Sequence, residues 1–540
     1  MDERRAASPA ALLFCPLMLQ ALSTLILVIM LHALPALAAS GDPGAQPDRP
    51  SAKQSDAMSD ARRDSTPEAP PEPCRGCAGV QYFRPSAPSA STPSESNRPS
   101  KAPPALRAPA SPGRSHLSSD PRVNTARVLV ERNRFAEALK ILLPLVADHP
   151  DQTDVRFLLG LAAVRGSQAR GLPDEQREAL LDAAIESFRS ILIRRPDLVR
   201  VRLELALAFY FKQEDNLARE HFERALVGKP PEALVENVTR LLKVIRARRR
   251  WNAWFGFSIA PDTNINAASD AEIIYINGLP FRRGAGIRAS TGIGIVGWGG
   301  GEYQYPLAER WRLRSGLNVN HREYKGNRWD QTFLAGYVGP RWLITQDTEL
   351  SLLATASQRW WGGSILNYDF GARLEVEHRV FAGLRLSGRA MWSDRKFQQQ
   401  TFLEGPLMVF SLGARYVLFP TVQVNALVGY QQQEAEFDPW SSAGYWTRAG
   451  TNVALPWGFT VGLSAEFRWT DFEAGWFPFV PDNSAREDHV RILQATLLNR
   501  AITVYGFSPQ IAFSNQLRTS NAQLYDFKRN LLEMRWVRQF

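Results

Sequence analysis

The sequence predicts an N-terminal α-solenoid of the tetratricopeptide type followed by a 14-stranded antiparallel transmembrane β-barrel. Three observations support this prediction. Residues 251–540 alternate apolar and polar side chains in one strand after another, residues 120–250 carry a helical apolar period and a 34-residue repeat, and the chain opens on an apolar segment typical of exported proteins. Strands of about ten residues with such alternation are characteristic of outer-membrane barrels, apolar toward lipid and polar toward the lumen.

Residues 1–38 are predicted to be a signal peptide. A charged start precedes the apolar run 10–31, and Ala36-Leu37-Ala38 offers a small-x-small cleavage site. The apolar run is long for a signal peptide, so an uncleaved anchor is the alternative.

Residues 39–119 are predicted to form a disordered linker. They are rich in Pro, Ser and Ala, and such a segment cannot bury enough apolar area to offset the entropy of ordering. The linker contains Cys74 and Cys77, which we interpret as a small disulfide, with a redox-active pair as the alternative. A metal site would need further ligands, and none lies nearby in the sequence.

Residues 120–250 are predicted to form three tetratricopeptide-like helix pairs and a final capping helix. Pro196 and Pro230 lie 34 residues apart, and each is preceded by small and aromatic residues at the same offsets. Small residues let paired helices approach, aromatic residues fill between them, and proline ends the second helix of each pair. The small and aromatic residues of the repeat are Ala184, Phe188, Ala218, Phe222 and Ala225. In an earlier unit that ends at Pro150, Ala138 and Leu142 are in register with them.

A solenoid of this kind offers a concave surface suited to a polypeptide, and a purely structural scaffold is the alternative. We expect Arg202 and Arg219 to be surface residues of the last full unit and candidates for client binding. The basic residues that end the capping helix are expected to stabilise its C-terminus or to lie at the membrane headgroups.

The barrel is predicted from fourteen strand candidates, an even number, as expected for a bacterial barrel. Their connections alternate between long and short, which places the long ones outside the cell and the helical domain in the periplasm. The candidates are 251–260, 286–305, 311–323, 330–345, 348–361, 366–380, 382–396, 402–419, 421–435, 443–455, 458–472, 486–499, 502–516 and 524–540.

Alternation within these strands identifies side chains expected to line the lumen. Arg373, Glu375, Arg385 and Arg389 alternate with apolar residues, so we expect them to give a polymer a polar path. The first external connection, 261–285, contains apolar isoleucines, and a segment that enters the pore or contacts a client is the alternative to a plain external loop. The final strand carries Trp536 and ends on Phe540, which is similar to the assembly signal of bacterial outer-membrane proteins; an aromatic girdle is the alternative.

The start of the barrel carries a more specific pattern. Strand 1 ends in Ala-Pro-Asp-x-Asn-x-Asn, comprising Ala260, Pro261, Asp262, Asn264 and Asn266. On residues alone, Pro, Asp and Asn are typical of a turn that begins a loop. A short tetratricopeptide region, this motif and about fourteen strands together resemble the surface lipoprotein assembly modulator (Slam) family, and Tyr337-Val-Gly-Pro-Arg341 is also similar to that family. The resemblance covers residues 120–540, and the long Pro-rich linker departs from it.

The resemblance implies an outer-membrane protein translocon of a Gram-negative bacterium. Its clients would be exported proteins: surface lipoproteins, or soluble proteins that acquire haem or metal. The expected partners are such a client, outer-membrane lipids, the barrel-assembly machinery and periplasmic chaperones. The sequence contains no nucleotide-binding motif, so client folding outside the cell or a partner machine would supply the energy.

Other function classes find less support in the sequence. The seven histidines show no paired metal spacing, no motif marks Ser387 or Ser464 as nucleophiles, and no cofactor is expected, so the chain is not predicted to be an enzyme. The net charge of +10 could suggest nucleic acid, but an exported barrel makes lipid headgroups and polymers the better partners. A polysaccharide exporter with tetratricopeptide repeats is the main alternative, although such proteins usually carry more repeats. A passive porin would have no clear use for a solenoid.

Overall fold

The computed structural model describes residues 120–227, 231–248, 250–276, 278–284, 287–476, 479–480, 483–505 and 507–538. The predicted signal peptide, the predicted linker with Cys74 and Cys77, and the terminal Phe540 lie outside these residues. No helix among the described residues is long and apolar enough to cross a membrane.

Seven helices form the N-terminal part of the described chain. They follow one another in pairs joined by short turns, and the last one stands alone. The helices are α2 (Pro121–Glu131), α3 (Phe135–Asp148), α4 (Thr153–Gly166), α5 (Asp174–Arg194), α6 (Val199–Phe211), α7 (Asp215–Leu226) and α8 (Glu232–Arg248).

The helix pairs pack as the repeat pattern predicts. Ala184, Ala206 and Ala218 are fully buried, and Phe188 and Phe222 fill the space between neighbouring helices. Gly160 allows the closest approach, because a Cβ atom there would lie 2.6 Å from Cε1 of Phe188. The small residues are therefore required by backbone proximity, which explains why the repeat is readable from sequence.

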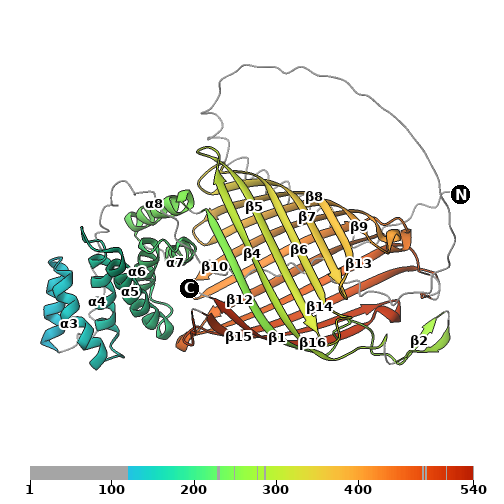
Figure 1. Ribbon diagram of the computed structural model, residues 1–540, viewed down its shortest axis with the longest axis horizontal. Helices are drawn as coiled ribbons and strands as arrows, with labels where there is room; N and C mark the ends of the chain where they lie inside the picture. Colours follow the sequence, from blue (N-terminus) through green and yellow to red (C-terminus); the bar gives the residue numbers. More distant parts are fainter. Residues whose placement is uncertain are drawn as a thin grey trace, which may run out of the picture. The chain divides into compact units, whose positions relative to one another are not determined.

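The remaining described chain forms a closed barrel of fourteen antiparallel strands, which confirms the predicted fold class. Each strand pairs with its sequence neighbour, and β1 closes the barrel by pairing with both β4 and β16 (Figure 1). The strands are β1 (Trp251–Asp262), β4 (Gly292–Pro306), β5 (Trp311–Tyr324), β6 (Gln331–Trp342), β7 (Thr348–Trp361), β8 (Ser364–Phe381), β9 (Leu384–Phe397), β10 (Gly405–Phe419), β11 (Val422–Gln433), β12 (Ser442–Ala454), β13 (Phe459–Gly475), β14 (Ala485–Asn499), β15 (Phe507–Ser520) and β16 (Phe527–Arg538).

The connection between β1 and β4 differs from the prediction. The first strand extends through Asp262 instead of ending at 260, and the second begins at Gly292 instead of 286. Between them, β2 (Ile273–Ile276) and β3 (Leu279–Arg282) form a separate two-stranded sheet. This hairpin lies beyond the ends of the barrel strands, at the lower right of Figure 1, and Tyr275 and Leu279 are more than half exposed.

The two ends of the barrel differ in their connections. The turns at one end are short, and α7 and α8 contact that end through ion pairs to β7 and β9 and a hydrogen bond from β5. At the other end, the longer connections between β9 and β16 carry aromatic residues that pack into one cluster. This difference agrees with the alternation of loop lengths in the sequence.

Candidate functional site

The inner wall of the barrel, toward the end with the short turns, contains a network of ion pairs that joins strands that are not neighbours in the sheet. Arg314 of β5 contacts Glu302 of β4 at 2.8 Å and Glu375 of β8 at 2.6 Å. Tyr337 of β6 donates its hydroxyl hydrogen to Glu302 at 2.6 Å, so the motif residue of strand β6 belongs to this network. Because Arg314 reaches a strand three positions away, charged side chains bridge the inner wall on this side.

The predicted lumen charges of β8 and β9 belong to the same network. Arg373 lies 3.1 Å and Arg389 lies 3.2 Å from Glu375, so three arginines converge on one carboxylate. Each of these side chains alternates with an outward apolar neighbour such as Leu374 or Trp392. The lumen is therefore lined by charges that are neutralised in pairs and clusters and still present many hydrogen-bond donors.

Arg385 connects the barrel to the helical domain. It forms ion pairs with Glu377 of β8 and, at 2.6 Å, with Glu223 of α7. Burial alone would raise the pKa of Glu223, but the charges of Arg385 and Arg219 outweigh it and hold this pKa below its ordinary value. Glu223 is thus ionised and paired at the mouth of the barrel.

The end of α8 makes a second connection to the barrel. Arg246 donates to the carbonyl oxygen of Thr345 at 2.8 Å and pairs with Glu349 of β7 at 3.1 Å. Arg312 of β5 donates in return to the carbonyl oxygen of Arg246 at 2.7 Å, which satisfies a carbonyl of the last helical turn. The basic end of this helix therefore contacts the barrel through Arg246, while Arg248 pairs with Asp215 of α7 at 2.6 Å.

One of the two candidate client-binding arginines was misplaced by the prediction. Arg202 is only 3% exposed and donates to the carbonyl oxygen of Pro196 at 2.6 Å, so the prediction that it lies on the surface is wrong. Its burial lowers its pKa to about 9. The repeat pattern marks packing positions by small and aromatic residues, and it gave no signal that a long cation fills this one. Arg219 is half-buried and adds to the positive charge near Glu223 and Glu377.

The motif at the start of the barrel forms a polar clamp where the sheet closes. Asp262, whose side chain is fully buried, accepts hydrogen bonds from Nε of Arg529 on β16, with both carboxylate oxygens at 3.0 Å. The hydroxyl of Tyr324 on β5 donates to the same carboxylate at 3.0 Å. We refer to Asp262, Arg529 and Tyr324 as the seam clamp. The turn interpretation of Pro261 and Asp262 is wrong, because both are residues of β1 held in the sheet by these contacts.

The other motif residues fix the chain just beyond the clamp. The side-chain amide of Asn264 donates to the carbonyl oxygen of Lys528 on β16 at 3.0 Å. The amide of Asn266 donates to the carbonyl oxygen of Arg288 at 2.8 Å and its oxygen accepts from the backbone of Ser290 at 3.0 Å. Ala260 is fully buried in a small apolar cluster with Val296 and Leu531. All five motif residues therefore lie at the junction of β1 with its neighbours.

An aromatic cluster lies among the longer connections at the opposite end from the helices. Arg486 at the start of β14 is 1% exposed, and its guanidinium lies 3.8 Å from the ring centroids of both Phe472 and Tyr525. Asp488 pairs with it at 3.1 Å. A cation held between two rings gains strength from desolvation and binds these connections to one another. The cluster also contains Leu403, Trp440, Trp476, Val480 and Ala522.

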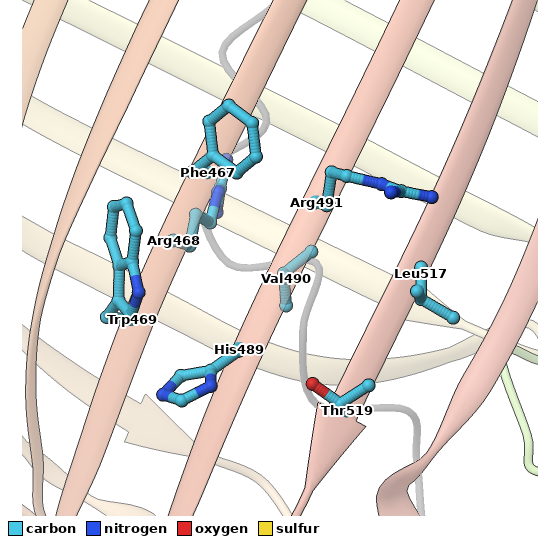
Figure 2. Close-up of a pocket in the computed structure, with 8 residues that line it drawn as sticks. All are labelled: Phe467, Arg468, Trp469, His489, Val490, Arg491, Leu517 and Thr519. Carbon is cyan, nitrogen blue, oxygen red and sulfur yellow. The ribbon is translucent and has the colours of Figure 1, made fainter.

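The outer wall shows the predicted alternation, with polar exceptions. Figure 2 shows Phe467 and Trp469 of β13 beside His489 and Arg491 of β14 around a shallow hollow that Leu517 and Thr519 also line. Arg468, the residue between the two aromatic groups, instead pairs with Glu466 inside the barrel. Two basic groups on this outward face are compatible with contact to lipid headgroups near the membrane surface.

Several residues of these networks could not be identified from the sequence. Arg529, Tyr324 and Glu302 come from three different strands, and only barrel closure brings them to their partners. In the sequence pattern, a charged residue on the polar face of a strand is the same whether its side chain is solvated or buried in an ion pair. Among the described residues, no group of three or more His, Cys, Asp or Glu side chains could hold a metal ion.

Comparison with known proteins decides the family. Residues 251–540 match the model of the surface lipoprotein assembly modifier family, which is more than half of the chain. The chain belongs to the surface lipoprotein assembly modifier family. This family comprises assembly factors and is not a known class of enzyme. In the helical domain, residues 123–183 match a tetratricopeptide repeat model.

Individual relatives agree with this family. Surface lipoprotein assembly modifier 1 of Neisseria meningitidis is 23% identical over 73% of this chain and 77% of that protein. Surface lipoprotein assembly modifier 2 of Haemophilus influenzae is 23% identical over 77% of this chain and 84% of that protein. Among solved structures, the outer membrane channel DcaP of Acinetobacter baumannii covers 53% of this chain and 96% of its own, at 8% identity and a TM-score of 0.31, a likeness too weak to support an argument. The family places the barrel in the outer membrane of a Gram-negative bacterium.

Proposed function

We propose that this family member is an outer-membrane translocon that receives an exported lipoprotein on its helical domain and passes the polypeptide through the barrel to the cell surface. The relatives are named for the assembly of surface lipoproteins, which supports this client class. A soluble protein that acquires haem or metal is a further client class compatible with the same path. The chain supplies no catalytic step in this proposal.

The observation that carries the proposal is the direct connection between the helical domain and the lumen. Arg385 bridges Glu223 of α7 and Glu377 of β8, and Glu377 lies on the same inner face as Glu375. A client held by the helices would therefore be released beside the charged wall of the barrel. Paired charges suit a moving polypeptide, because unpaired charges of one sign would retain a segment of the opposite sign.

The other partners follow from the environment of such a barrel. Outer-membrane lipids would contact the apolar outer wall, and periplasmic chaperones would deliver both this chain and its client. The barrel-assembly machinery would recognise the final strand, with Trp536 and Phe540 as the predicted signal.

A deletion series tests the proposed function and does not require the client to be identified beforehand. Surface-exposed lipoproteins are identified by protease treatment of intact cells and mass spectrometry in three strains: wild type, a strain lacking the gene, and a strain whose protein lacks residues 120–248. We expect at least one lipoprotein to leave the surface in both altered strains while the shortened barrel stays in the outer membrane. An unchanged set of surface lipoproteins in the strain lacking the gene would overturn the proposal.

A point variant tests whether the connection itself matters. Glu223→Arg places a cation against Arg385, and we expect it to lower surface display without lowering the amount of barrel. Glu236→Arg is the matched control, because Glu236 is an exposed glutamate of α8 that pairs with Arg240 of its own helix. Equal display by both variants would show that the Arg385 connection is dispensable.

A further inference from the structure

The joint between β1 and β16 differs from the other joints of the barrel. β1 is in register with β4 at every position from Trp251 to Asp262. Between the described residues of β1 and β16, register partners occur only at Phe257, Ser258, Ile259 and Asp262. We call this joint the seam.

A proline explains the interruption of the seam. The backbone N–H of Thr263 donates to the carbonyl oxygen of Asn530 on β16 at 3.0 Å. Residues two apart along a strand direct their N–H groups to the same neighbour, so the nitrogen of Pro261 also faces β16. Proline has no hydrogen to donate there, and the register skips Ala260 and Pro261.

Two other joints contain a gap but pair over a long stretch. The register of β13 with β14 is complete from Phe459 to Asp471 and is interrupted between Asp471 and Gly475. The register of β6 with β7 skips Gly339 and Pro340, yet pairing covers the strand from Gln331 to Val338 before the gap and resumes after it. The β1 residues before Phe257 would pair at the end of β16, where the described chain stops, so the gap at Ala260 and Pro261 is the feature that weakens the described part of the seam.

Side chains hold the seam at its outer end. The seam clamp joins Asp262 to Arg529, and Asn264 donates to the carbonyl oxygen of Lys528 just beyond it. Below the clamp, the inner side chains give less support: Ser258 reaches Glu533 only at 3.4 Å, and Glu533 pairs with Arg535 of its own strand. The outer face along the seam is apolar, with Ile259 and Met534 each about half exposed.

We propose that the seam opens sideways and lets the acyl anchor of a lipoprotein client move through the membrane to the outer leaflet while the polypeptide passes through the lumen. This inference rests on the proposed function. Acyl chains are strongly disfavoured in a water-filled lumen lined by charges such as Arg314 and Glu375. The wall must therefore part for a client that keeps its anchor. The seam clamp keeps the first and last strands aligned so that the wall recloses.

Cross-links across and beside the seam provide the test in cells. Ile295, Ile259, Met534 and Ile511 form one outward row across β4, β1, β16 and β15. Register partners on one face lie about 4.5–5.5 Å apart between Cβ atoms, close enough for a disulfide with slight adjustment. Ile259→Cys with Met534→Cys locks the seam. Ile511→Cys with Met534→Cys and Ile259→Cys with Ile295→Cys lock the two adjacent joints as controls, each in a chain with Cys74→Ser and Cys77→Ser.

The surface lipoproteins of these strains are compared with those of wild type and of the strain lacking the gene. We expect the seam lock to remove the same lipoproteins as loss of the gene, the control locks to leave them in place, and a reductant to restore display by the seam-locked protein. Normal display with a fully cross-linked seam would overturn the inference while leaving the proposed function intact. No change on loss of the gene would instead refute the proposed function.

Hydrogen exchange tests the seam without any client. The full chain is placed in vesicles of phosphatidylethanolamine and phosphatidylglycerol, and backbone exchange is followed by mass spectrometry. We expect faster exchange in 257–262 and 528–536 than in 461–469 and 489–497, which pair with each other without a gap in the β13–β14 joint. Pro261→Val should slow exchange at the seam, since it restores a donor toward β16. Equal exchange at both joints would overturn the inference.

Discussion

At the scale of single residues, this protein places buried charges where parts of the chain meet. Asp262 and Arg529 join the first and last strands, and Arg385 and Glu223 join the barrel to the helices. A buried ion pair contributes little net stability compared with an apolar pair, but removing one partner is costly. Such pairs are therefore suited to aligning elements, and their loss should be visible in stability measurements.

We predict that Asp262→Ala destabilises the barrel by about 3–5 kcal/mol, because it leaves the buried guanidinium of Arg529 uncompensated. Urea unfolding in detergent, followed by heat-modifiable migration on gels, measures the effect. The double variant Asp262→Ala with Arg529→Leu should recover part of the loss, since neither charge remains. Asp394→Ala is the control, because Asp394 is an exposed partner of Lys396. Equal stability of the single variant and the control would contradict the clamp.

A second residue-scale prediction concerns acid sensitivity of the helical domain. His221 is buried on α7 and stacks on Phe209 at 5.6 Å between ring centroids. Burial, together with nearby arginines, holds the pKa of His221 well below its ordinary value. The unfolded chain therefore binds a proton at higher pH than the folded domain does. The free energy of unfolding should be constant above about pH 6.5 and fall below it, by up to about 1.4 kcal/mol per pH unit, until the folded pKa is reached.

Circular dichroism of the full chain in detergent measures this effect, because helix melting dominates the signal at 222 nm. His221→Phe should remove most of the difference in melting temperature between pH 8 and pH 5. His149→Gln serves as the control, since His149 is exposed. A wild-type helical domain that melts at the same temperature at both pH values would refute the prediction.

At the scale of elements, the helix pairs depend on a few small residues, and the strands depend on pairing along their length. Gly160 of α4 faces the ring of Phe188 on α5, so any side chain there would push the two helices apart. The barrel strands tolerate change on their outer face better, because a lipid-facing side chain meets fluid neighbours. We therefore expect the helical domain and the barrel to unfold independently of each other.

We predict that Gly160→Val destabilises the helical domain by about 1–3 kcal/mol through overpacking, and leaves the barrel unchanged. Limited proteolysis of the full chain should cleave 120–248 faster while heat-modifiable migration of the barrel is preserved. Glu175→Ala, at an exposed position of α5, is the control. Unfolding of the barrel together with the helices would contradict the independence of the two domains.

At the scale of the whole molecule, orientation follows from two independent features. The short turns and the helical domain lie at one end of the barrel, and the long connections with the aromatic cluster around Arg486 lie at the other. We therefore predict that the first end faces the periplasm and the second faces the medium. A client would thus meet the helices first and the aromatic cluster last.

Labelling of intact cells measures this orientation. Lys325→Cys lies in an exposed connection of the long-loop end, and Ala169→Cys lies in an exposed turn of the helical domain. An impermeant thiol reagent should label the first and not the second, and both should react after the outer membrane is broken. Both variants carry Cys15→Ala, Cys74→Ser and Cys77→Ser so that only the new thiol is read. Labelling of Ala169→Cys alone in intact cells would reverse the orientation.

The extent of prediction from sequence differed among parts of the molecule. The solenoid and the fourteen strands were predictable because helix packing and lipid exposure each impose a local period on side chains. The motif from Ala260 to Asn266 was visible as a pattern, but its role was not. Its interpretation as a turn holds only from Asn264 to Ala267, and it is wrong for Pro261 and Asp262 because the partners that hold Asp262 in β1 come from β5 and β16.

The sequence by itself determined the order of the two domains, the number of strands and the side of each strand that meets lipid, because those properties depend on residues close in the chain. Only the tertiary structure decided that Arg202 is buried, that Arg385 reaches the helical domain, and that Pro261 interrupts the closing joint. Each of these depends on closing the barrel and placing the helices, which bring together residues 6 to 267 positions apart. The pattern of apolar and polar residues shows which face of a strand a side chain occupies. Its partner on that face is determined by the closed sheet.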